Sequence, residues 1–146
     1  MTELVYLLNG SNLNMLGKRE PHLYGTTTLA EVQQRVAGLA DELRIDCDFR
    51  QTNSEATMVD WLQEAFEKNA AVIINPAGFS FASVPVLDAV KLIQRPVIEL
   101  HITNIHAREE THRHSIISRA ATGVICGLGV AGYTLALRAM ADALRS

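Results

Sequence analysis

The chain has 146 residues, which suits one domain, and its 48% hydrophobic and 20% charged residues are ordinary for a globular protein. A net charge of −3, without a long run of one sign, argues against nucleic acid or an anionic membrane as the main partner. No apolar run is long enough to span a bilayer, and no signal peptide is evident. We therefore expect a cytoplasmic protein, with Cys47 and Cys126 as free thiols.

The chain opens with a predicted strand and a long loop. Residues 4–8 are a short apolar run that ends at an Asn-Gly turn, and residues 9–27 are polar and contain glycine. Long loops in compact domains are often functional. A helix is expected after this loop, because Thr28 and Glu31 have the spacing of a capping box.

A second strand and helix follow the first pair. Residues 45–49 are predicted to be a strand, and Ser54 is predicted to cap a helix that buries Met58, Leu62, Ala65 and Phe66. Residues 71–74 then form an apolar run that leads into an Asn-Pro turn. This run predicts a buried third strand.

The second half of the chain continues the alternation. A helix is expected over residues 83–93, where Pro85 is tolerable only in the first turn. Strands are expected at 97–100 and 122–126, and a closing helix at 130–145. Repeated strand–helix pairs predict a single α/β domain with a doubly wound, five-stranded parallel sheet and helices on both faces. Ligands of such sheets bind at the carboxyl ends of the strands.

The loop after the first strand carries one group of reactive side chains. Tyr24 is a phenol, and phenols are poor bases because their ordinary pKa is about 10. A guanidinium such as that of Arg19 would favour the phenolate, and Asn12 is placed to hydrogen-bond a developing oxyanion. From these residues alone, a solvated loop with an aromatic anchor is the favoured interpretation.

A second group follows the fourth strand. Glu99 and His101 lie two residues apart, so both side chains point to one face, where a carboxylate fixes the tautomer of an imidazole. The amides of Ile102 and Thr103 then become candidates for holding a substrate carboxylate. A surface ion pair is the structural alternative. Several histidines follow, but no Cys or tight carboxylate set joins them, so we expect no metal.

Two further segments give weaker signals. Asn75 closes the third strand and Ser83 is placed to open a helix, which ordinary turn chemistry also explains. Gly127, Gly129 and Gly132 have the dinucleotide-binding spacing, but too few residues follow them for the strand that would carry a ribose-binding acid. We expect these glycines to serve a tight turn and close helix–strand packing.

Taken together, these segments resemble the type II 3-dehydroquinate dehydratases over nearly the whole chain. The similar stretches are NGSNLNMLGKREPHLYG, QTNSEATMVDWL, HITNIHARE and GVICGLGVAGYTLAL, in the family's order. The resemblance implies a flavodoxin-like fold, no cofactor, and a trimer-based homododecamer. It implies the anti elimination of water from 3-dehydroquinate through an enolate to give 3-dehydroshikimate. Both the shikimate pathway and quinate catabolism remain open.

The resemblance also implies roles for individual residues. Tyr24 matches the base, Arg19 the group that keeps it ionised, and Asn12 the side chain that organises water at the enolate oxygen. His101 matches the acid, supported by Glu99. The matches to substrate contacts are Asn75, the amides of Ile102 and Thr103, and Asp88, which neighbouring subunits share near the site.

Three positions depart from the family's pattern. Phe81 stands where the family has histidine, Leu87 where it commonly has arginine, and His112 where it has arginine. The family's residues there bind ring hydroxyls, so Phe81 would leave a hydroxyl unpartnered, at a cost of about 1–3 kcal/mol. Protonated His112, or Arg113, is a candidate replacement for the lost arginine.

Several functions therefore remain open. The first is a working dehydratase of reduced affinity, and the second is a dehydratase for a less hydroxylated cyclohexanone acid. A binding protein without turnover is a third, although a pure binder needs neither a base nor an acid. A flavodoxin-like nucleotide binder is a fourth, but Arg19 and Tyr24 stand where its phosphate loop would be.

Overall fold

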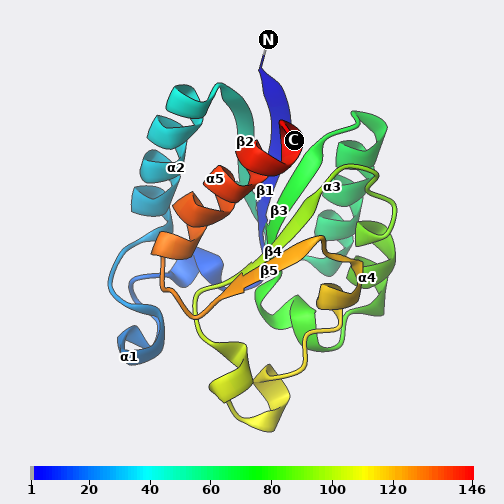
Figure 1. Ribbon diagram of the computed structural model, residues 1–146. Helices are drawn as coiled ribbons and strands as arrows, with labels where there is room; N and C mark the ends of the chain where they lie inside the picture. Colours follow the sequence, from blue (N-terminus) through cyan, green and yellow to red (C-terminus); the bar gives the residue numbers. More distant parts are fainter. Residues whose placement is uncertain (1) are drawn as a thin grey trace.

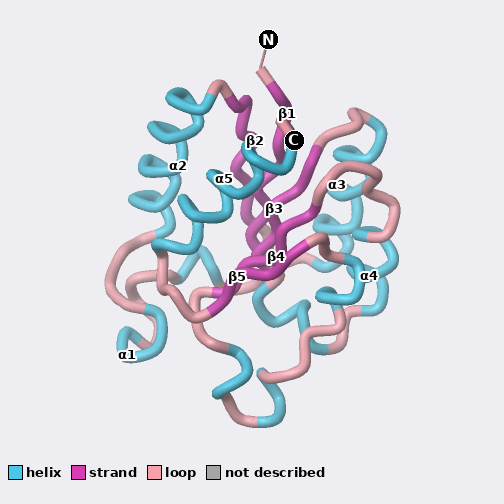
Figure 2. The backbone as a smooth tube through the Cα atoms, in the orientation of Figure 1, coloured by secondary structure: helices cyan, strands magenta, loops and turns pink. Residues whose placement is uncertain are grey.

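The computed structural model describes residues 2–146, and its centre is a parallel sheet (Figures 1 and 2). The five strands lie in the order β2-β1-β3-β4-β5, and every neighbouring pair is parallel. This is the order of flavodoxin-like folds, as expected. The strands are β1 Glu3–Asn9, β2 Ile45–Gln51, β3 Ala71–Asn75, β4 Val97–His101 and β5 Gly123–Cys126.

Helices cover both faces of the sheet. In Figure 1, α2 and α5 lie together on one side of the strands, and α3 and α4 lie on the other. Each pair encloses its own cluster of buried apolar side chains, as the predicted doubly wound architecture requires. The helices are α1 Pro21–Tyr24, α2 Leu29–Leu43, α3 Glu55–Glu67, α4 Val84–Val90 and α5 Ala131–Leu144.

The predicted caps are confirmed. The Thr28 hydroxyl accepts from the Glu31 amide at 3.2 Å, and the Glu31 side chain accepts from the Thr28 amide, which completes the capping box. The Ser54 and Ser83 hydroxyls each accept from one amide in the first turn of α3 and α4, both at 3.2 Å, and Pro85 lies in the first turn of α4. Local sequence therefore fixes where three helices begin.

Some element predictions were wrong in detail. Phe66 was expected to face inward, but it is 37% exposed, because Met58, Leu62 and Ala65 already fill the buried face of α3. The loop over 9–27 contains α1 and a short 3₁₀ turn at Leu13–Met15. Helix α4 ends at Val90, before the predicted end at 93. Within residues 2–146, no helix combines the length and apolarity that crossing a membrane requires.

The strand directions bring the functional loops together. All five carboxyl ends point to the lower edge of the sheet in Figure 1, where α1 and the segment between β4 and β5 also lie. That segment contains three 3₁₀ turns, at Ile105–Ala107, Glu110–His112 and Ile117–Ala120. A fourth follows β3, at Ala77–Phe81.

Candidate functional site

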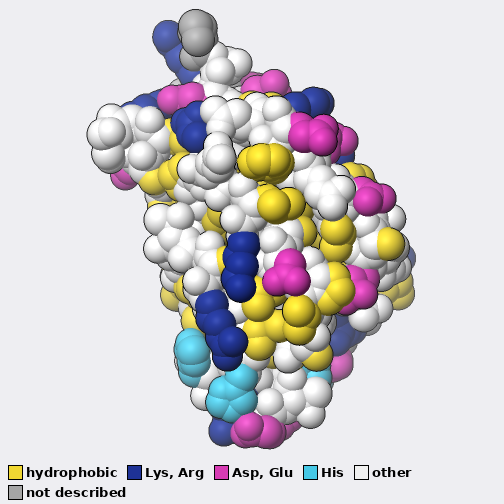
Figure 3. Space-filling model, turned by 90° about the vertical axis from the view of Figure 1, so that its right-hand side faces the viewer, with side chains coloured by type: hydrophobic (Ala, Val, Ile, Leu, Met, Phe, Trp, Pro, Cys, Tyr) yellow, Lys and Arg dark blue, Asp and Glu magenta, His cyan; other side chains and the backbone are white. Residues whose placement is uncertain are grey.

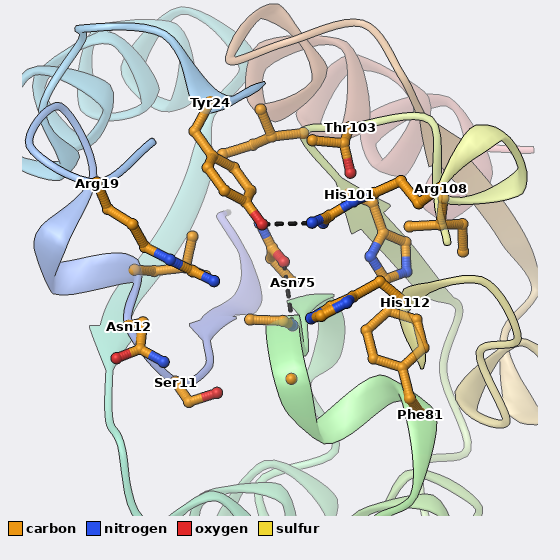
Figure 4. Close-up of a pocket in the computed structure, with 15 residues that line it drawn as sticks. Ser11, Asn12, Arg19, Tyr24, Asn75, Phe81, His101, Thr103, Arg108 and His112 are labelled. Atoms are coloured by element: carbon orange, nitrogen blue, oxygen red, sulfur yellow. Dashed lines mark hydrogen bonds between the residues drawn. The ribbon is translucent and has the colours of Figure 1, made fainter. Parts of the chain in front are cut away.

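A cavity of about 120 Å³ lies at this carboxyl edge, where the loops after β1, β3 and β4 meet (Figure 4). Its size suits one small molecule. Its walls combine charged, amide and apolar side chains. The lining residues are Ser11, Asn12, Leu13, Arg19, Tyr24, Asn75, Ala77, Gly78, Phe81, His101, Ile102, Thr103, Ile105, Arg108 and His112.

The phenol of Tyr24 lies between two guanidinium groups. Arg108 Nη1 donates a hydrogen bond to the Tyr24 hydroxyl oxygen at 2.9 Å, drawn as a dashed line in Figure 4. The Arg19 guanidinium lies over the face of the same ring, 4.8 Å from its centre. Only the Arg108 guanidinium contacts the hydroxyl oxygen of Tyr24 directly, because that of Arg19 lies over the ring face.

His101 and Glu99 form a buried pair, as their spacing on β4 predicted. His101 Nε2 lies 2.5 Å from Glu99 Oε2, and the exposed fractions are 4% and 0%. Burial raises the pKa of Glu99, but hydrogen bonds from His101, Ser115 and Ser118 outweigh it, so this pKa lies below its ordinary value. A carboxylate only accepts, so Nε2 carries a proton and Nδ1 is the nitrogen left for a ligand.

Asn75 joins the cavity to the core. Its Nδ2 donates to the Tyr133 hydroxyl at 3.0 Å, and that hydroxyl donates to Asn9 Oδ1 at 2.7 Å. Its Oδ1 accepts from the Ala77 amide at 3.3 Å. A primary amide has two N–H groups, so Asn75 keeps one for a ligand while its orientation is fixed from behind.

One wall of the cavity is aromatic. The Phe81 ring packs edge-on against His112, with 5.4 Å between ring centres, and lies 6.5 Å from the His101 ring. His112 Nδ1 lies 2.5 Å from Glu109 Oε1, outside the cavity. Figure 4 shows this wall opposite Arg19 and Asn12. The site is therefore cationic and amide-rich on one side and aromatic on the other.

Most of the predicted site residues meet at this cavity. Asn12, Arg19, Tyr24, Asn75, Phe81, His101, Ile102, Thr103 and His112 line it.

Four other positions that the sequence singled out lie outside the lining. Glu99 lies behind His101, and Leu87 is 6% exposed in the core. Asp88 is exposed on α4, and Arg113 donates through Nε to the Arg108 carbonyl at 2.8 Å. Arg113 therefore supports the backbone of Arg108 and makes no contact with the cavity of this chain.

Sequence reasoning missed three side chains that support the reactive groups. Arg108 belongs to the HITNIHARE stretch, so its motif and positive charge were available as a signal, but Tyr24 lies 84 residues away. Ser115 and Ser118 donate to Glu99 from a segment whose irregular turns carry no periodic pattern.

The glycine segment is structural, as expected. Gly127 and Gly129 have positive φ angles of 87° and 65°, and the Gly129 amide donates to the Ile102 carbonyl at 3.0 Å. A side chain at Gly132 would lie 2.7 Å from Leu100 Cδ1, so its absence allows α5 to approach β4. In the part of the chain that the structure describes, no three His, Cys, Asp or Glu side chains are grouped for a metal ion.

Fold and site together define a flavodoxin-like α/β protein with a small, charged ligand site at the carboxyl edge of its sheet. A sequence model of the family described as Dehydroquinase class II matches residues 3–141. The chain belongs to this class II dehydroquinase family, whose members are hydro-lyases.

Individual relatives agree with this assignment. A 3-dehydroquinate dehydratase of Brucella canis is 51% identical over 141 residues, which span 97% of this chain and 90% of the relative. The type II dehydroquinase of Propionibacterium acnes superposes with a TM-score of 0.94 at 44% identity, covering 97% of this chain and 98% of its own. That of Butyrivibrio crossotus gives 0.93 at 29% identity, covering 95% and 97%.

Proposed function

We propose that this protein dehydrates 3-dehydroquinate to 3-dehydroshikimate. The observation that carries the proposal is that Tyr24 and His101 line one small cavity, each with the charged partner that its role needs. The family and the names of the relatives support the same reaction.

In this proposal, Tyr24 is the base. Its phenolate takes a proton from the carbon next to the ketone, and the electrons of the broken C–H bond form an enolate. Arg108 and Arg19 stabilise the phenolate before that step, the first by a hydrogen bond and the second over the ring face. Asn12 organises water at the enolate oxygen, where negative charge develops.

His101 is the acid. It protonates the hydroxyl on the opposite side of the substrate ring as the enolate collapses, the C–O bond breaks, and water leaves. Glu99 favours the imidazolium that gives up this proton and fixes the orientation of the ring. The elimination is anti because the base and the acid approach from opposite faces.

Five further predicted residues that line the cavity bind the substrate in this proposal. Asn75 contacts the head of the ring with its free N–H, and the amides of Ile102 and Thr103 hold the carboxylate. Phe81 and His112 form the far wall.

Turnover of 3-dehydroquinate is tested by the absorbance of the conjugated enone product. We expect the absorbance to rise with the unaltered protein and to stay flat with Tyr24→Phe, while circular dichroism of the two is the same. Tyr6→Phe is the matched control, because Tyr6 belongs to the core cluster on the α3 and α4 side of the sheet. Retained turnover in Tyr24→Phe would mean that another group is the base.

The aromatic wall favours a second candidate within the same chemistry. Phe81 offers no hydrogen bond to a ring hydroxyl, so a less hydroxylated cyclohexanone acid would fit this wall at lower cost. The combined variant Phe81→His with His112→Arg separates the candidates. Turnover of 3-dehydroquinate that appears only in this variant would assign the unaltered protein to the second candidate. Strong turnover by the unaltered protein would remove it, and no turnover by either would leave a binding role.

We further propose a homo-oligomer built from trimers, as the resemblance implies. Asp88 is exposed on α4 and does not line the cavity of its own chain, which suits a role toward a neighbouring subunit. Figure 3 shows the side of the molecule on which α4 lies, with apolar side chains gathered near its middle among charged ones. Val84 on α4 is 54% exposed. Sedimentation of the protein and of Val84→Glu tests this assembly, because a charge at a buried interface should dissociate it.

A further inference from the structure

Both oxygens of the buried Glu99 carboxylate are occupied by hydrogen bonds. His101 Nε2 and the Ser115 hydroxyl both lie 2.5 Å from Oε2, and the Ser118 hydroxyl lies 2.5 Å from Oε1. Glu99 has no exposed surface, so water does not replace these partners. A charge in such a place persists only when it is paired and hydrogen-bonded.

His101 satisfies only one side of the carboxylate. Without Ser118, Oε1 would have no donor, and a buried carboxyl without donors favours its protonated, neutral form. A neutral Glu99 would no longer favour the imidazolium form of His101, which is the form that carries the proton for the leaving hydroxyl. The two serine hydroxyls therefore act on the proton of His101 through Glu99.

We propose that Ser115 and Ser118 are positioning residues that keep Glu99 an aligned carboxylate, so that His101 holds its proton toward the cavity. This inference rests on the proposed role of His101 as the acid. The serines touch neither the cavity nor a ligand within it, and their effect passes through Glu99.

The segment that carries these serines is firmly anchored. Ile117, between them, is fully buried, and the Ile116 amide donates to the Ser80 carbonyl at 2.8 Å. The same connection between β4 and β5 also carries Arg108, which donates to the Tyr24 hydroxyl. One segment thus supports both the proposed base and the proposed acid, and its anchoring holds the hydroxyls in place.

The ionisation of Glu99 tests the proposal without any need for turnover. The carboxyl carbon of Glu99 is followed by ¹³C NMR against pH, and Glu99→Gln assigns its signal. We expect Ser118→Ala and Ser115→Ala each to raise the midpoint of this titration by about one pH unit, the value of one hydrogen bond to a charged group. Ser118→Thr keeps the hydroxyl and should stay near the unaltered protein.

Ser80→Ala is the matched control. Its hydroxyl is buried, and in the part of the chain that the structure describes it has no hydrogen-bond partner. This variant removes the same atom from the same neighbourhood without touching Glu99, so the Glu99 titration should not move.

Kinetics with 3-dehydroquinate give the second readout. We expect Ser118→Ala to lower kcat about tenfold with little change in KM, and to lower it no further when Glu99→Gln is already present. An equal loss in both backgrounds would mean that Ser118 only supports packing, and would overturn the proposal. A Glu99 midpoint that stays fixed in both alanine variants would overturn it as well. If the midpoint moves but the unaltered protein does not turn over 3-dehydroquinate, the positioning of Glu99 stands and the proposed function fails.

Discussion

Replacing Tyr133 with phenylalanine removes one hydroxyl and leaves two buried amides without their partner. Asn9 Oδ1 loses its donor at 2.7 Å and Asn75 Nδ2 loses its acceptor at 3.0 Å. Asn9 is 0% and Asn75 3% exposed, so water cannot take the place of the hydroxyl without a rearrangement. Each unsatisfied buried group costs about 1–3 kcal/mol, which makes the expected loss of stability for the two groups about 2–6 kcal/mol.

Urea unfolding at a single protein concentration measures this loss. A decrease of that size lowers the midpoint by about 1–3 M urea at an unchanged m-value of about 2 kcal/mol/M. The concentration must be equal for all variants, because assembly of subunits also contributes to apparent stability.

Tyr6→Phe is the matched comparison. Tyr6 is also fully buried, but its hydroxyl donates to Glu64, which keeps Arg50 as a partner at 2.6 Å and is 36% exposed. Water and Arg50 therefore satisfy Glu64 when the hydroxyl is removed, and the expected loss is about 0.5–1.5 kcal/mol. Equal losses in the two variants would refute the reasoning, because the difference in partner burial would then have no effect.

Three further predictions concern glycine, pH and cysteine. Gly127→Ala should destabilise the fold by about 1–3 kcal/mol, because its φ is 87° and the added carbon would lie 2.9 Å from Asn104 Cβ. Gly38→Ala should stabilise the fold by about 0.5–1 kcal/mol, because Gly38 lies on α2 with open space around the added carbon. Urea unfolding compares the two variants. The pKa of Glu99 in the folded protein lies below the ordinary value of 4.5. The ionised carboxyl therefore stabilises the fold above pH 4.5, and this stabilisation is lost as the pH falls through the pKa of the folded state. Urea midpoints between pH 7 and pH 3 should therefore fall less steeply in Glu99→Gln, and parallel curves would contradict this. Burial raises the pKa of Cys47 to about 12. Iodoacetamide at about pH 8 should therefore alkylate Cys47 far more slowly in the folded protein than in urea, and mass spectrometry of the peptide that contains Cys47 measures the two rates.

The fold was largely predictable because its signals are local. Helix caps such as the Thr28–Glu31 box need only three residues of spacing, and apolar runs mark buried parallel strands wherever they occur. Phe66 was misplaced because its position borders the buried face of α3, where spacing alone does not decide exposure.

The site was predictable where its partners are close in sequence. Glu99 and His101 alternate along one strand, so their pairing follows from strand geometry. The hydrogen bond from Arg108 to Tyr24 joins the loop after β1 to the segment after β4, two strands that lie on either side of β3. Nothing in local spacing selects Arg108 over Arg19 for that contact, because the selection depends on the order of the strands.

The hydrogen bond from Tyr133 to Asn9 spans 124 residues and ties the last helix to the first strand. During synthesis, β1 and β3 leave the ribosome before α5 does, so Asn9 and Asn75 lack this partner until Tyr133 has been made. Chains that stop before Tyr133 would keep every predicted catalytic side chain yet lack the hydroxyl that orients Asn75. The site is therefore fully assembled only after the residues of α5 have been synthesised.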